Sequence, residues 1–228
     1  MAKKTFEPPK DGSNNGKSAE NAKGTKKGYV SPEATEEMAT PSYGSDKKQK
    51  WHNGYLDPDD NWEEAKAFVM RVAGVSEKEA IDMLNAVTAW TESWYDSIRE
   101  LQQGTLPDWH DDKLVKKLSD NLEKYISRAA KWGGGTTYRG IDVGVNVNVG
   151  DKIDMLGTAS WSSSEHTARS FAGDGTVFVC ETQSKGVSLK FGSAHPAENE
   201  VAVSKDAKYQ VERTAVVDGV RYYFVKEI

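Results

Sequence analysis

Hydrophobic residues divide the chain into three parts that differ in periodicity. Residues 1–50 contain no Leu, Ile or Trp, hold four of the seven prolines and are rich in Lys, Gly, Ser, Asn and Glu. This composition buries too little apolar surface to offset the entropy lost on ordering. We therefore expect a disordered polar tail over residues 1–50, which is either simply solvated or is recognised by a partner as a delivery or packaging signal.

Residues 51–132 show helical spacing of apolar positions. Ser76-Glu77-Lys78-Glu79 has the form of a capping box, and Gly74 before it and Gly104 after it are expected to end helices. Two apolar faces are expected to pack in a core: Trp90, Trp94, Ile98 and Leu101, then Leu114, Leu118, Leu122, Tyr125, Ile126 and Ala129. The sequence therefore predicts a helical region that ends at the glycine run beginning with Gly133.

Residues 133–228 change to short runs rich in Val, Thr, Tyr and Phe, which predict strands. The runs are 136–140, 158–162, 176–182, 186–191, 200–204, 209–217 and 221–226. Asp218-Gly219 is a two-residue hairpin signal, so the last two strands should pair antiparallel. We expect an α+β fold in which N-terminal helices pack on a mostly antiparallel β core, with residues 51–228 forming one domain.

Composition excludes several classes of protein. The chain of 228 residues has 37% hydrophobic residues, a mean hydropathy of -0.70 and a net charge of -5, and it has no apolar run near the ~18 residues of a membrane span. We expect neither a membrane nor a nucleic-acid partner. Residues 5–20 are polar, so no secretory signal is expected. Cys180 is the only cysteine, which excludes an internal disulfide.

The sequence lacks the common motifs for metal or nucleotide binding. The four histidines show no His-x-x-x-His or His-Glu-x-x-His spacing, so no metal site is expected. Neither a Gly-x-Gly-x-x-Gly sequence nor a phosphate-loop lysine motif occurs. A metal hydrolase, a Rossmann enzyme and a nucleoside triphosphatase therefore have no support.

Two carboxylates are the strongest sign of chemistry. If residues 200–204 form a strand, the period of two places Glu198 and Glu200 on one side. Like charges side by side repel, so function explains this pair better than stability does. The plainer alternative is a charged edge strand that discourages aggregation.

Two further polar motifs lie on predicted strands. Arg139 precedes Gly140, which lets another backbone or a ligand come close, and an arginine fork suits phosphate oxygens. Ser160 and Ser162 should share one face of a strand whose other face buries Trp161. By themselves, these motifs are equally consistent with a surface arginine and with a strand that leads into a capped helix.

Taken together, the order of these motifs resembles the R-S-E signature of arginine-directed mono-ADP-ribosyltransferases. This family includes actin-modifying toxins, phage transferases and vertebrate ectoenzymes. The matching residues are Tyr138-Arg139-Gly140, Ser160-Trp161-Ser162 leading to Ala168-x-x-Phe171, and Glu198-x-Glu200. Residues 90–99 also resemble the helix that precedes the catalytic core. The usual Ser-Thr-Ser appears as Ser-Trp-Ser or, shifted, as Ser162-Ser163-Ser164, and the spacing to Phe171 favours Ser160 over Ser162 as the key serine.

The resemblance implies NAD as the substrate and a two-sheet ADP-ribosyltransferase fold. Glu200 would hold the ribose and stabilise its developing positive charge, Arg139 would pair with the phosphates, and Ser160 would orient Glu200. Glu198 would bind and deprotonate the acceptor arginine. Gly140, Ser162 and Arg169 would contribute further NAD contacts. Residues 191–197 would meet the target protein.

The leading hypothesis is a monomeric transferase that modifies an arginine of a target protein in a target or host cell cytoplasm after secretion or phage delivery. Two alternatives stay open. An NAD glycohydrolase would use water as the acceptor. A non-catalytic binding or virion-packaged protein would carry the Glu pair only as surface charge.

Overall fold

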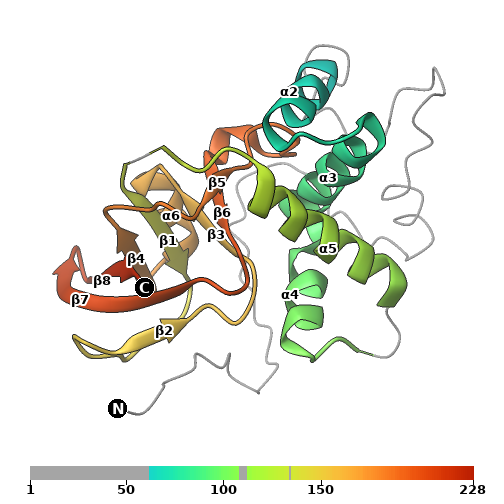
Figure 1. Ribbon diagram of the computed structural model, residues 1–228. Helices are drawn as coiled ribbons and strands as arrows, with labels where there is room; N and C mark the ends of the chain where they lie inside the picture. The colour runs from blue at the N-terminus through green and yellow to red at the C-terminus, as the bar shows by residue number, and fades with distance from the viewer. Residues whose placement is uncertain (1–61, 108–111, 134) are drawn as a thin grey trace, which may run out of the picture.

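The computed structural model describes residues 62–107, 112–133 and 135–228, so the expected tail over residues 1–50 lies outside the described residues. The helices that precede the sheet are α2 (Glu63–Ala73), α3 (Glu77–Ala89), the π-helical turn η3 (Trp90–Trp94), α4 (Tyr95–Gln103) and α5 (Asp112–Arg128). The later elements are β1 (Thr137–Ile141), β2 (Lys152–Asp154), β3 (Ala159–Ser162), α6 (Glu165–Ala172), β4 (Thr176–Cys180), β5 (Val187–Ser188), the 3₁₀ turn η4 (Pro196–Glu198), β6 (Glu200–Val203), β7 (Lys208–Val217) and β8 (Val220–Glu227). Helices α2 to α5 lie on one side of the molecule and the sheet lies on the other (Figure 1).

The helix ends follow the expected local signals. The Ser76 side chain accepts a hydrogen bond from the backbone N–H of Glu79, whose carboxylate accepts one from the backbone N–H of Ser76. Gly74 and Gly104 end α2 and α4 in the left-handed conformation, which glycine adopts without a Cβ clash. The α3 to α4 segment is one helical run interrupted by η3, so the sequence located its caps but missed the π turn.

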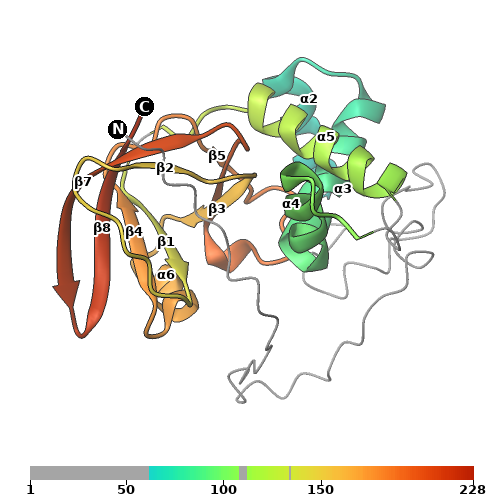
Figure 2. The same cartoon turned by 90° about the horizontal axis from the view of Figure 1, so that it is seen from below.

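The eight strands form a single hydrogen-bonded sheet in the order β2-β7-β8-β4-β1-β3-β6-β5. All neighbouring strands are antiparallel except β4 and β8, which are parallel. β1 and β3 share only one residue pair, Tyr138 with Ser162, whereas β1 and β4 share five. The two sheets expected from the sequence are therefore two halves joined at this narrow contact, and Figure 2 shows β3 diverging from β1. The mixed helix-and-sheet fold class is confirmed.

Most predicted strands form close to their expected positions. Asp218 and Gly219 make the turn between β7 and β8 with φ of 48° and 81°, as the hairpin signal predicted. β2 was not predicted, since a strand of three residues is too short to show alternation. Among the described residues, no helix is long and apolar enough to cross a membrane.

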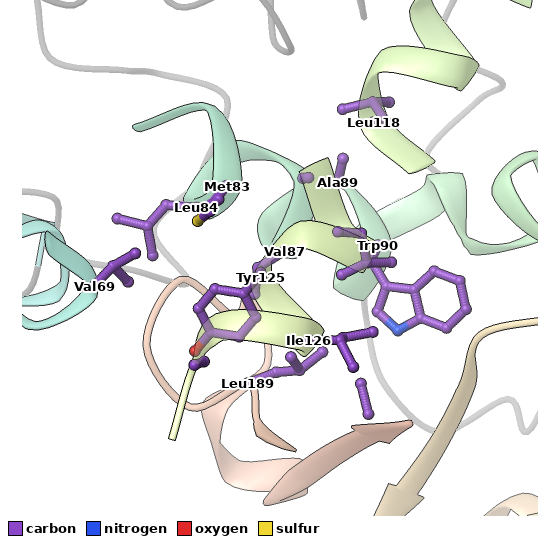
Figure 3. Packing of buried hydrophobic residues seen from close by; sticks show 14 of the residues in the cluster. Val69, Met83, Leu84, Val87, Ala89, Trp90, Leu118, Tyr125, Ile126 and Leu189 are labelled. Atoms are coloured by element: carbon purple, nitrogen blue, oxygen red, sulfur yellow. The ribbon is translucent and has the colours of Figure 1, made fainter. Parts of the chain in front are cut away.

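The main core lies inside the helical layer and extends to the sheet. Leu84, Leu118, Tyr125 and Ile126 are buried there together with Leu189 from the sheet side (Figure 3). A second cluster, centred on Trp161, Tyr209 and Tyr223, fills the space between strands. Both predicted apolar faces are mainly buried, which confirms them as core, with Trp90 at the margin of the first cluster.

A partly buried polar network connects the helical layer to the start of β3. The Gln102 amide accepts a hydrogen bond from the backbone N–H of Thr158 (2.7 Å) and donates one to its hydroxyl (2.9 Å). The Thr158 hydroxyl donates to Glu123 of α5, which also accepts from Ser204 at the end of β6. Arg99 donates to the carbonyl oxygen of Thr158. The helices therefore set where β3 and β6 lie.

Candidate active site

A cavity of about 640 Å³ lies where the helices, β1, β3, α6 and β6 meet. Its wall includes Arg139, Gly140, Ser160, Ser162, Glu198 and Glu200, that is, six of the seven residues chosen from the sequence. Residues from η3 and α4 form the opposite wall, and Phe171 of α6 contributes an exposed aromatic ring. The structure thus brings Arg139 and Glu200, which are 61 positions apart in the sequence, into one cavity.

Glu200 is the first residue of β6 and is almost fully buried, with 8% of its surface exposed. Its Oε1 accepts hydrogen bonds from the Ser160 hydroxyl and from the Trp90 indole N–H, the latter at 2.8 Å. Burial raises the pKa of Glu200, the two hydrogen bonds lower it, and the nearby Glu198 raises it again, for a net upward shift. Such a carboxylate is held in one place and is poorly solvated, as an electrostatic catalyst must be.

Glu198 lies at the same cavity, but the backbone conformation that places it there differs from the expected strand. It ends the 3₁₀ turn η4, and Asn199 then adopts the left-handed conformation with φ of 50° before β6 begins. The expected strand alternation therefore does not extend to Glu198, because a turn and not a strand precedes Glu200. Burial raises the pKa of Glu198, and His195 opposes the shift. Two carboxylates with raised pKa values now face one cavity.

The two candidate serines have different partners. The Ser160 hydroxyl contacts Glu200 directly and accepts from the Trp90 indole at 3.0 Å. The Ser162 hydroxyl donates to the carbonyl oxygen of Glu198 at 2.6 Å and accepts from the backbone N–H of Ser164 at 2.9 Å. Ser160 thus orients a carboxylate, whereas Ser162 fixes the backbone of the turn that carries the other one.

Arg139 supplies positive charge to the cavity. Its Nη1 donates to the carbonyl oxygen of Ser160 at 2.7 Å, which anchors the guanidinium beside β3. Burial, together with the nearby Arg99, lowers the pKa of Arg139 to about 10, so the side chain remains a cation at neutral pH. A partly buried guanidinium that makes one hydrogen bond within the described part of the chain is suited to an anionic group such as a phosphate.

Gly140 and Arg169, two of the expected NAD contacts, lie against other parts of the protein itself. A Cβ at Gly140 would lie 1.8 Å from the Ala168 carbonyl oxygen, so this glycine permits the close approach of α6 to β1. Gly140 lines the cavity, but the backbone that comes close is the protein's own. Arg169 is not part of the cavity wall. Its positive charge acts to lower the pKa of Tyr222, which donates a hydrogen bond to Glu165, so Arg169 lies near this pair.

The loop before Glu198 is only partly open to a target protein. Phe191 stacks on Phe68 of α2, with ring centroids 4.5 Å apart. The Gly192 carbonyl oxygen accepts from the Thr88 hydroxyl at 2.6 Å, and the Ala194 N–H donates to the Thr91 hydroxyl at 2.9 Å. Residues 191–194 are thus held by the helices. The segment facing solvent at the cavity begins at residue 195, which is a narrower surface than the expected 191–197.

Trp90 lines the candidate site and contacts Glu200, and the sequence analysis did not select it. Its place in an apolar stripe indicated core, and only 3% of its surface is exposed. The signal that could have revealed it is chemical, because a buried indole N–H requires an acceptor. The π turn that begins at Trp90 is a second signal, since such turns occur frequently at functional sites.

Comparison with solved structures places this architecture among ADP-ribosyltransferase folds. Exoenzyme S from Pseudomonas aeruginosa, solved with human 14-3-3 protein beta and carba-NAD, is 22% identical over 78% of this chain and 88% of that chain, with a TM-score of 0.55. The Vis toxin, an ADP-ribosyltransferase from Vibrio splendidus, is 16% identical over 85% of this chain and 90% of that chain, with a TM-score of 0.59. The eukaryotic mono-ADP-ribosyltransferase ART2.2, as a mutant in complex with NAD, is 21% identical over 72% of this chain and 74% of that chain, with a TM-score of 0.53.

The likeness is one of structure and not of sequence. No protein-family model matches the chain, and no curated protein matches its sequence. The chain therefore has the fold of the ADP-ribosyltransferases, and its activity has to be argued from the site.

Proposed function

We propose that the protein is a mono-ADP-ribosyltransferase that cleaves NAD and transfers ADP-ribose to an arginine of a target protein. The observation that carries the proposal is the convergence of Glu200, Glu198, Ser160 and Arg139 on one cavity. Solved structures of the same fold contain NAD or carba-NAD, which supports NAD as the substrate here.

The residues fit the charges of the reaction. The bond between the nicotinamide nitrogen and ribose C1′ breaks, neutral nicotinamide leaves with the bonding electrons, and positive charge develops on the ribose. Glu200, ionised and anchored by Ser160, stabilises that charge. Arg139 pairs with the pyrophosphate, which holds the two halves of NAD in place.

Glu198 acts on the acceptor. An arginine has a pKa above 12 and is a poor nucleophile while protonated. Glu198 binds the incoming guanidinium and accepts its proton as the nitrogen attacks C1′, so the products are nicotinamide and ADP-ribosylated arginine. Its position in the turn η4, at the cavity wall beside exposed Asn199, is open to a side chain presented by another protein.

The test is incubation of the full chain with tagged NAD and a cell lysate. Label on protein that peptide mass spectrometry locates on an arginine supports transfer to arginine. Glu200→Gln should abolish both nicotinamide release and labelling, because the developing cation loses its counter-charge. Glu198→Gln should retain nicotinamide release and lose labelling. Free ADP-ribose with no labelled protein would favour NAD glycohydrolysis, and full activity of Glu200→Gln would refute the assignment.

We further propose that the enzyme acts in the cytoplasm of a target cell, where NAD and acceptor proteins are both present. Similar folds occur in proteins described as a toxin and as a type III effector, which supports this setting. A catalytically inactive Glu200→Gln chain introduced into candidate cells is the control for toxicity caused by the active one.

A further inference from the structure

Two donors from two different elements meet at a single carboxylate oxygen of a third element. The Trp90 indole N–H, from η3, lies 2.8 Å from Glu200 Oε1 and 3.0 Å from the Ser160 hydroxyl oxygen. The Ser160 hydroxyl, from β3, donates to the same Oε1. Glu200 itself begins β6. Nothing in the reaction described above uses the indole.

We propose that Trp90 is a positioning residue for Glu200: its N–H fixes Oε1 against the cavity wall and leaves Oε2 to meet the substrate ribose. This inference rests on the proposed function. Within the described part of the chain, Oε2 accepts no hydrogen bond, whereas Oε1 accepts two. The two carboxylate oxygens therefore have different tasks, one structural and one directed at the ligand.

The indole is better suited to this task than the serine hydroxyl alone. A hydroxyl hydrogen rotates about its C–O bond and can turn to another acceptor. The indole N–H lies in the plane of a ring that is 3% exposed and packs at the edge of the helical cluster (Figure 3), so packing restricts its direction. The packing of the helical layer therefore determines, through Trp90, where the carboxylate lies.

The charge balance at Glu200 gives the indole a second effect. Burial and the neighbouring Glu198 favour the protonated acid, while the Ser160 and Trp90 hydrogen bonds and the positive charge of Arg139 favour the carboxylate. A protonated Glu200 could not stabilise a cation. Trp90 therefore helps to keep Glu200 ionised at neutral pH, as well as holding it in place.

The test compares Trp90→Phe with Trp94→Phe. Phenylalanine keeps an aromatic ring in the core, removes the donor and also removes part of the indole's volume, a loss of volume that Trp94→Phe shares. Trp94 is an ideal control because it is a buried tryptophan in the same π turn, and it lies outside the cavity wall. We expect Trp90→Phe to lower kcat for nicotinamide release by roughly 10- to 100-fold with little change in KM, as for the loss of a hydrogen bond to a charged group. The acid limb of its pH profile should move to higher pH, and that of Trp94→Phe should not.

A second readout does not depend on activity. Carbon-13 NMR of the full chain labelled at glutamate Cδ follows the titration of Glu200, whose signal is assigned by its loss in Glu200→Gln. The pKa of Glu200 should rise in Trp90→Phe and stay unchanged in Trp94→Phe. An unchanged pKa, or a pH profile shared by the two variants, overturns the inference. If the wild-type chain cleaves no NAD while the NMR shift occurs, the proposed function fails and the contact between Trp90 and Glu200 stands.

Discussion

Replacing Gly140 by alanine should be one of the most damaging single-methyl additions in the protein. An added Cβ would lie 1.8 Å from the Ala168 carbonyl oxygen and 2.8 Å from the Ala172 nitrogen, both in the backbone of α6. Carbon and oxygen in close favourable contact are about 3.3–3.6 Å apart, so α6 would have to retreat from β1 by roughly 1.5 Å. Backbone atoms cannot rotate away as a flexible side chain does, and so the whole helix must move.

The cost follows from overpacking. A forced shift of this kind destabilises a protein by about 1–3 kcal/mol, which for a chain of this size lowers Tm by roughly 2 to 12 °C. Because Ala168 and Phe171 of α6 line the cavity, binding of NAD should weaken as well.

The assay is thermal unfolding of Gly140→Ala beside Gly144→Ala. Gly144 has nothing within 4 Å of an added Cβ and no positive φ, so its alanine variant should match or slightly exceed the wild type in stability. Equal Tm values for the two variants would refute the account of how α6 packs on β1.

Three further predictions concern a helix cap, the loop and the buried acid. Ser76→Ala should lower the free energy of unfolding by about 1 kcal/mol, because the backbone N–H of Glu79 loses the hydroxyl that accepts its hydrogen bond. Chemical denaturation measures this change, and an unchanged midpoint would contradict it. Thr91→Val should leave the Ala194 N–H without its acceptor and destabilise the loop locally by about 1–3 kcal/mol; hydrogen exchange of that amide should accelerate, and unchanged protection would show that the hydroxyl does not hold the loop. The raised pKa of Glu200 means that the folded state holds the proton more tightly, so its ionised form opposes folding above that pKa. Glu200→Gln should therefore raise Tm at pH 7, with a gain that shrinks as the pH falls through the raised pKa towards 4.5, and a gain independent of pH would exclude this cause.

Local sequence signals predicted much of the secondary structure. The capping box at Ser76, the helix end at Gly74 and the turn at Asp218-Gly219 each depend on a few consecutive residues, so their sequence signals are complete in themselves. The change of period near residue 133 likewise separates helices from strands, because 3.6-residue and two-residue repeats are visible in short windows.

The sequence did not predict which distant strands pair with one another. β4 lies parallel to β8 and antiparallel to β1, and only one residue pair joins β1 to β3. Such choices depend on which strand edges meet after the helices pack, and no short stretch of sequence encodes them.

The candidate site divides in the same way. The sequence by itself determined the residue types, since Arg139, Ser160, Glu198 and Glu200 could be chosen from their motifs and all line the cavity. Only the tertiary structure decided how they meet: a left-handed Asn199, and not strand alternation, brings Glu198 to the cavity. It also decided that Trp90, which the sequence shows as an ordinary core residue, contacts Glu200 across 110 positions of the chain. Periodicity tells which face of an element is buried, whereas the acceptor of a buried N–H depends on the neighbouring element that packing brings to it.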